Sequence, residues 1–160
     1  MRIPTIYLET TIFNFPFTND APQYRADTLR LFEEIKAGKF KPFTSEYVID
    51  ELEAATDSLK EKRIRLIKEY GVEVIPASDE VKNLAAVYIE AGIIPPAYAT
   101  DGFHLAAATV KGLDFIVSLN FKHIVKRKTI ELVELINYRE SYKKIGIYTP
   151  AEVIDYDENF

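Results

Sequence analysis

The sequence has 160 residues, of which 48% are hydrophobic and 28% are charged, so we predict one globular domain (1–160) with a full hydrophobic core. The absence of cysteine excludes disulfides and thiolate metal sites, and no apolar run approaches the roughly 20 residues that a membrane helix needs. The net charge of −5 counts against strong binding of long nucleic acid by bulk electrostatics, although a local site stays compatible with it. The N-terminus has no signal-peptide pattern, so we expect a cytoplasmic protein without membrane contact.

The first half of the chain alternates short apolar runs, which predict buried strands, with segments in which apolar residues have helical spacing. In chain order the predicted elements are a strand (Ile3–Leu8), a helix from Gln23 that Gly38 ends, a strand (Lys41–Thr44), a helix capped by Ser45 and a helix (Leu59–Tyr70). The segment around Phe15-Pro16-Phe17 is predicted to be a loop.

The second half continues this alternation. Its predicted elements are a strand (Val72–Ile75), a helix capped by Ser78 that runs through Ala91, a loop (Ile93–Tyr98), a helix from Thr100 or Asp101 through Val110, a strand (Asp114–Leu119), a basic loop, a helix (Thr129–Tyr138) and a strand (Ile145–Tyr148). Strands separated by helices predict an α/β fold with three layers, α/β/α, around a mainly parallel sheet.

Four polar side chains stand where a predicted strand ends or a predicted helix begins: Glu9, Glu51, Asp101 and Asn120. In an open α/β sheet such positions converge at the edge where ligands bind. Carboxylates gathered there repel one another unless a cation or a shared proton relieves them. The sequence therefore predicts a site for a hard metal ion at this edge, with phosphodiester chemistry as its use.

Each of these residues also has a purely structural interpretation. Glu9 suits the first turn of a helix, Asp101 suits a helix N-cap, and Asn120 suits a turn. Glu51 borders an apolar stripe, although a lone glutamate on a helix is usually solvent-exposed. His104, one turn after Asp101, is more often a core or supporting histidine than a metal ligand.

The order of these segments resembles the PIN domain. The resemblance rests on a strand ending in an acid (I-Y-L-E), then S-x5-E-L, then D-x-x-H-L-A-A-A, then a strand ending in S-L-N-F, and a closing I-Y-T-P-A-E-V. It covers nearly the whole chain, from Tyr7 to about Val153. It implies an α/β/α nuclease that hydrolyses RNA with Mg²⁺ or Mn²⁺, and many members are the toxins of prokaryotic toxin–antitoxin pairs.

The resemblance also implies roles for individual residues. Glu9, Glu51 and Asp101 correspond to the family's metal-binding acids, and Asn120 to its fourth polar position, so these four are the expected catalytic residues. Two departures matter: the first acid is usually aspartate, and the fourth position is often aspartate. A glutamate at the first position is one methylene longer, and an asparagine at the fourth lowers the charge of the site.

Further residues are candidates for contact with RNA or with a protein. Thr10 is a plausible supporting donor, and a basic run beside Asn120 suits the phosphate backbone: Lys122, Lys126, Arg127 and Lys128. A solvated loop is an equal alternative for this run. Phe13, Phe15 and Phe17 suit base stacking, the core, or a surface for a partner, and we favour the partner surface. The expected partners are RNA, a cognate antitoxin and a second copy of the chain.

Three other classes compete with a nuclease. A non-catalytic PIN-like module that binds RNA or protein would keep the fold without the metal, and the departures at Glu9 and Asn120 suit it. A phosphoacceptor domain of the response-regulator type fits poorly, because Pro76-Ala77-Ser78 follows the middle strand in place of a phosphorylatable aspartate. A serine hydrolase is weaker still, since the G-x-S-x-G motif is absent.

Overall fold

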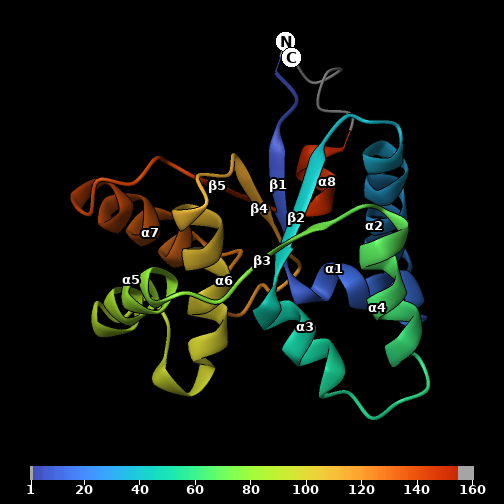
Figure 1. The fold of residues 1–160 in the computed structure, drawn as a ribbon, viewed down its shortest axis with the longest axis horizontal. Helices are drawn as coiled ribbons and strands as arrows, with labels where there is room; N and C mark the ends of the chain where they lie inside the picture. Colours follow the sequence, from blue (N-terminus) through green and yellow to red (C-terminus); the bar gives the residue numbers. More distant parts are fainter. Residues whose placement is uncertain (1, 155–160) are drawn as a thin grey trace.

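The centre of the protein is a five-stranded sheet. The structure is a computed structural model, and it describes residues 2–154. The strands are β1 (Thr5–Leu8), β2 (Lys41–Ser45), β3 (Glu73–Ile75), β4 (Phe115–Val117) and β5 (Gly146–Tyr148). Every pairing is parallel, and the spatial order is β3-β2-β1-β4-β5 (Figure 1). The predicted α/β class with a parallel central sheet is confirmed.

Helices cover both faces of this sheet, as predicted. They are α1 (Thr10–Asn14), α2 (Pro22–Lys36), α3 (Glu46–Glu53), α4 (Lys60–Glu69), α5 (Asp79–Glu90), α6 (Ala99–Val110), α7 (Arg127–Arg139) and α8 (Pro150–Val153), with 3-10 turns η1 (Phe15–Phe17) and η2 (Pro96–Tyr98). Figure 1 shows α2, α4 and α8 on one side of the sheet and α5, α6 and α7 on the other. Within residues 2–154 no helix combines the length and the apolar character that a membrane span requires.

The strand order predicts that ligands bind beside β1, in a crevice outside the carboxyl ends of the strands. The chain moves outward from β1 to β2 and β3, and then returns to add β4 on the opposite side of β1. In such sheets ligands bind outside the carboxyl ends of the strands at this point of reversal. Glu9 directly follows β1, and Asn120 follows β4 by three residues, so both lie at this crevice.

Strand β1 is buried on both faces, as expected for the middle of a parallel sheet. The side chains of Ile6, Tyr7 and Leu8 are fully buried. Leu8 is in register with Val117 of β4, and the amide of Glu9 donates to the Val117 carbonyl at 3.2 Å. This last backbone bond fixes Glu9 against the end of β4.

The end of β4 differs from the prediction. The strand stops at Val117 rather than at Leu119, because side chains take over the backbone hydrogen bonds. The amide of Leu119 donates to Thr11 Oγ1 at 2.8 Å, and the amide of Asn120 donates to Ser118 Oγ at 2.9 Å. The segment after β4 is thereby bent toward α1 instead of continuing the sheet.

Two helices begin earlier than predicted. Helix α6 begins at Ala99 with Tyr98 as its N-cap, so Asp101 lies inside the first turn and is not a cap. Helix α7 begins at Arg127, so the expected basic loop is shorter and Arg127 and Lys128 belong to the helix. Neither start carries a side-chain cap, which removes the signal that sequence reasoning relies on.

The aromatic segment after β1 also differs from the prediction. Phe13 is fully buried and its ring lies 6.2 Å from that of Phe32, so the interpretation of Phe13 as a surface residue is wrong. The expected loop at Phe15–Phe17 is a 3-10 turn whose phenylalanines are partly buried. Phe13 belongs to α1 and lies on the side of this helix that packs against the core.

Asp114 has a structural role. It lies before β4, at the amino end of the strand, and pairs with Arg2 and Lys143 at 2.8 Å each. The hydrogen bond with Arg2 is the main reason that the pKa of Asp114 is held well below its usual range. Asp114 thus ties the N-terminal segment to the edge of the sheet opposite the acidic residues.

Candidate active site

Glu9 is a buried carboxylate held from one side. It is the N-cap of α1, and its Oε1 accepts from Ser118 Oγ at 2.7 Å, from Thr11 Oγ1 at 2.5 Å and from the Thr11 amide at 3.2 Å. Only 3% of the residue is exposed. Burial raises the pKa of Glu9, against the lowering effects of His104 and of these hydrogen bonds.

Glu51 on α3 meets a fully buried His104 from α6. His104 Nε2 lies 2.5 Å from Glu51 Oε1, which also accepts from Thr10 Oγ1 at 2.7 Å. Burial opposes charge on His104, but the bond to Glu51 and the negative charges of Glu9, Glu51 and Asp101 outweigh it and raise its pKa. Partial burial opposes charge on Glu51, yet His104 and Thr10 lower the pKa of this carboxyl. Both shifts favour an ion pair.

Sequence reasoning missed the partner on the other side of His104. His104 Nδ1 lies 2.7 Å from the hydroxyl of Tyr7, which lies 2.7 Å from Ser45 Oγ. An ionised Glu51 only accepts, so Nε2 carries a proton, and Tyr7 donates to Nδ1 when the ring is neutral. The signal was available in part, because a tyrosine in the middle of a buried strand must find a hydrogen-bond partner.

Asp101 is half-buried in the first turn of α6 and completes the acidic group. Burial raises its pKa and Glu51 adds to this, while His104, a hydrogen bond with Asn120 and His123 act in the opposite direction. His104 therefore interacts electrostatically with all three carboxylates. The structure brings together Glu9, Glu51 and Asp101, which are far apart in the sequence, around one imidazole.

Asn120 links two of the acids through its neighbours. Its side chain is close enough to Asp101 to lower the pKa of that carboxyl, and its Oδ1 accepts from the His123 amide at 3.0 Å. Its own amide donates to Ser118 Oγ, and Ser118 donates to Glu9. Asn120 thus orients the loop after β4 and ties it to both Asp101 and Glu9.

The basic residues that follow are less closely gathered than the sequence suggested. Lys122 Nζ lies 3.2 Å from the hydroxyl of Tyr98, beside the start of α6. Lys126 is the N-cap of α7, and Arg127 pairs with Glu131 on its own helix at 2.9 Å with 90% of its side chain exposed. Of these three, Lys122 is the one whose side chain contacts a segment adjoining Asp101.

Comparisons with known proteins address the fold. No family model and no curated protein matches the sequence. Three solved structures match over 91% of this chain: VapBC2 from Rickettsia felis bound to a DNA fragment from their promoter (15% identity, 98% of that chain, TM-score 0.55), FitAB bound to the IR36 DNA fragment (13%, 94%, 0.56) and FitAcB from Neisseria gonorrhoeae (14%, 97%, 0.55).

The chain has a PIN-domain fold. Identities of 13–15% show this fold and do not by themselves assign an activity to the PIN-domain chain. Function depends on the side chains that the fold positions at the carboxyl edge of the sheet.

These side chains fit a hard divalent cation better than zinc. Both nitrogens of His104 are engaged, so the available ligands are oxygens, which Mg²⁺ and Mn²⁺ prefer. The hydrogen bonds described for Glu9 and Glu51 all reach Oε1, which makes Oε2 of each the atom suited to a cation. Among residues 2–154 no three acidic or histidine side chains form a preformed metal cage. Mg²⁺ does not need one, because it commonly uses one or two carboxylates with waters and substrate phosphates.

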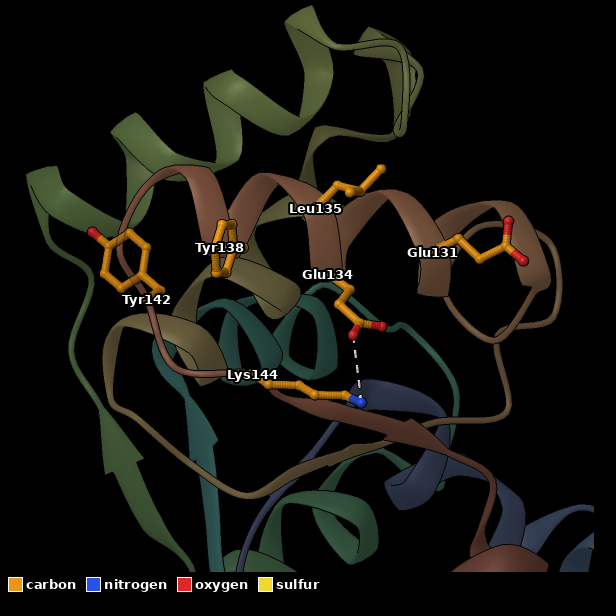
Figure 2. Close-up of a pocket in the computed structure, with 6 residues that line it drawn as sticks. All are labelled: Glu131, Glu134, Leu135, Tyr138, Tyr142 and Lys144. Atoms are coloured by element: carbon orange, nitrogen blue, oxygen red, sulfur yellow. Dashed lines mark ion pairs between the residues drawn. The ribbon is translucent and has the colours of Figure 1, made fainter.

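A separate hollow of about 580 Å³ lies on α7 of the PIN-domain fold (Figure 2). It is lined by Glu131, Glu134, Leu135, Tyr138, Tyr142 and Lys144. Lys144 precedes β5, so this hollow adjoins the amino edge of the sheet, while the acids follow carboxyl ends. The hollow includes none of the candidate catalytic residues.

The His104–Glu51 pair predicts a pH-dependent stability. Because the pKa of His104 is raised, this group contributes stability that is fully present below about pH 6.5 and is lost as pH rises through its folded pKa. Because the pKa of Glu51 is lowered, this group contributes stability that is present above about pH 4.3 and is lost as pH falls through its folded pKa. Glu51→Gln keeps the shape and removes the charge. We expect it to cost about 1 kcal/mol in urea unfolding at pH 5.5, discounted because 39% of the Glu51 side chain is exposed, and less at pH 8.5. An equal cost at both pH values would contradict an ion pair.

Proposed function

We propose that this chain is a metal-dependent endoribonuclease that hydrolyses phosphodiester bonds of RNA with Mg²⁺ or Mn²⁺. The observation that carries the proposal is the gathering of Glu9, Glu51 and Asp101 around His104 at the crevice beside β1. Three carboxylates in a partly buried group call for a positive partner. His104 supplies part of that charge and a divalent cation would supply the rest.

Each residue of this acidic group would have a separate role in the reaction. Glu9 and Asp101, with Glu51, would hold the cation, which when bound would polarise a phosphoryl oxygen and acidify a water. Thr10 and His104 fix the carboxylate of Glu51 so that it can orient an attacking water or accept its proton. Asn120 would hold Asp101 in place and offer its amide to a water or to the substrate.

The biological setting is also part of the proposal. FitAB and VapBC2 were each determined bound to a DNA fragment, and the match with each covers 91% of this chain. By analogy we infer that this chain is the toxin of a toxin–antitoxin pair, acts on RNA in the cytoplasm, forms a homodimer and is inhibited by a cognate antitoxin. Lys122, Lys126 and Arg127 are the residues we assign to the RNA backbone.

A non-catalytic PIN-like module that binds RNA or protein is the second candidate. It is favoured by the lack of a preformed metal cage within residues 2–154. It is also favoured by the extensive neutralisation of the acids by protein groups, since Glu9 receives three donors and Glu51 receives His104. Such a module would show no affinity for Mn²⁺ at this edge.

The test is cleavage of labelled single-stranded RNA together with calorimetric titration of Mn²⁺. We expect cleavage with Mg²⁺ or Mn²⁺, its complete loss in excess chelator and its recovery when metal is restored. Absence of Mn²⁺ binding at millimolar concentration would exclude the nuclease and leave the binding module. Cleavage that resists the chelator would point to a contaminating enzyme.

A further inference from the structure

The loop between β4 and α7 and the turn η2 before α6 each expose one aromatic ring near the acidic site. Phe121 follows Asn120 and is 44% exposed. Tyr98, three residues before Asp101, is also 44% exposed. Lys122 and His123, which follow Phe121, contact Tyr98, so the two segments that carry these rings meet beside Asp101. Exposed aromatic side chains gathered at one site indicate an interaction surface.

Each ring is held by contacts with neighbouring side chains. Phe121 lies 5.5 Å from the ring of Tyr24, which is 42% exposed and packs edge-on against Phe15 at 5.9 Å. Tyr98 lies 4.3 Å from the ring of His123, and Lys122 Nζ stands 4.8 Å from the centre of the Tyr98 ring. The rings are therefore held in place while much of their surface stays open.

His123 provides an independent sign that a ligand completes this surface. It is 7% exposed, and neither Nδ1 nor Nε2 has a hydrogen-bond partner within the described part of the chain. Buried polar atoms without partners are rare because they cost free energy. The ring contacts Tyr98 on one side and is near enough to Asp101 to lower the pKa of that carboxyl. An unsatisfied polar group thus lies between the platform and the acids.

We propose that Tyr98 and Phe121 form a platform on which unpaired nucleobases stack, next to the phosphate that the acids would hydrolyse. This inference rests on the proposed nuclease function and names its substrate class as single-stranded RNA. Aromatic rings stack on any base that is not paired, and Lys122 beside Tyr98 offers a cation to the adjoining phosphate. A duplex cannot use the platform, since its bases are already stacked and paired. Tyr98 lies three residues before Asp101, and Lys122 and His123 of the loop that carries Phe121 contact it. The rings therefore adjoin the acids and a cation, which favours RNA over a protein partner as the occupant.

The test measures binding separately from cleavage. Single-stranded RNA carrying 2-aminopurine is titrated with protein in chelator, and a labelled duplex of the same sequence is titrated beside it. We expect preference for the single strand, quenching of 2-aminopurine on binding, and about 5- to 100-fold weaker binding by Tyr98→Ala and by Phe121→Ala. Tyr98→Phe keeps the ring and should bind as the wild type does. Tyr138→Ala is the matched control, because Tyr138 is 86% exposed on α7 beside the separate hollow (Figure 2).

A double-mutant cycle identifies stacking as the cause. Removing bases from the RNA as abasic sites should weaken wild-type binding and abolish the difference between wild type and Phe121→Ala. Three results would overturn the platform: equal affinity for single strand and duplex, no measurable binding, or unchanged affinity in both alanine variants. In the last case the exposed rings would instead bind a protein partner. If RNA is cleaved but the variants bind normally, the platform fails and the nuclease stands. If RNA stacks on the rings but is never cleaved, the nuclease fails and the platform stands.

Discussion

Asp101→Asn should reduce metal-dependent cleavage of single-stranded RNA by about 100-fold or more. Loss of even an outer partner of a metal ligand costs roughly 10- to 100-fold in affinity or activity, and a ligand itself should cost at least as much. The substitution keeps the size of the side chain and its capacity to bond with Asn120, while it removes the charge. The measurement is the initial rate of cleavage at saturating Mn²⁺ and again across a metal titration.

The fold should survive this change, which makes the result interpretable. Helix α6 begins at Ala99 and Tyr98 is its N-cap, so Asp101 does not cap the helix. Burial penalises the charge of Asp101, so the neutral side chain should not destabilise the protein. Asp50→Asn is the matched control, because Asp50 is exposed on α3 beside Glu51. Equal rates for wild type and Asp101→Asn would remove Asp101 from the catalytic group.

The order of elements and the place of the site followed from the sequence. Alternating strands and helices predicted the parallel sheet, and the polar residues at strand ends predicted where ligands bind. Glu9 and Asn120 lie at that edge because each follows a central strand within three residues. Such positions depend on local sequence, which is why they could be predicted.

The contacts between elements did not follow from the sequence. The bond between Tyr7 on β1 and His104 on α6 depends on how a helix crosses the sheet, which no local pattern encodes. The same holds for His123 beneath Tyr98, since a loop residue and a 3-10 turn meet only after α6 is docked. The interpretation of Phe13 is wrong for a related reason. The sequence predicts a loop with three phenylalanines after the first strand, whereas Phe13 lies in α1 and is buried by the packing of that helix.

Glu9→Gln should make the protein more stable in chelator and less responsive to metal. Gln retains an oxygen for the hydroxyls of Ser118 and Thr11 but carries no buried charge. Because the pKa of Glu9 is raised, the contribution of this group to wild-type stability is fully present below about pH 4.3 and is lost as pH rises through the pKa of Glu9 in the folded protein. We expect the variant to gain about 0.5–2 kcal/mol in urea unfolding at pH 7, with the gap closing below pH 4.

Added Mn²⁺ should then reverse the order of stability. A ligand that binds only the folded state stabilises it by about 4.1 kcal/mol at 1,000 times its dissociation constant. The wild type should gain this amount and Glu9→Gln less than a third of it, so the wild type becomes the more stable protein only when metal is present. Glu61→Gln, an exposed substitution on α4 with the same change in net charge, should respond as the wild type does. Equal gains in all three proteins would show that Glu9 does not bind the ion, while no gain in the wild type would favour the binding module. A crossing of the two stability curves would mean that the buried charge of Glu9 destabilises the metal-free fold and serves to hold the cation.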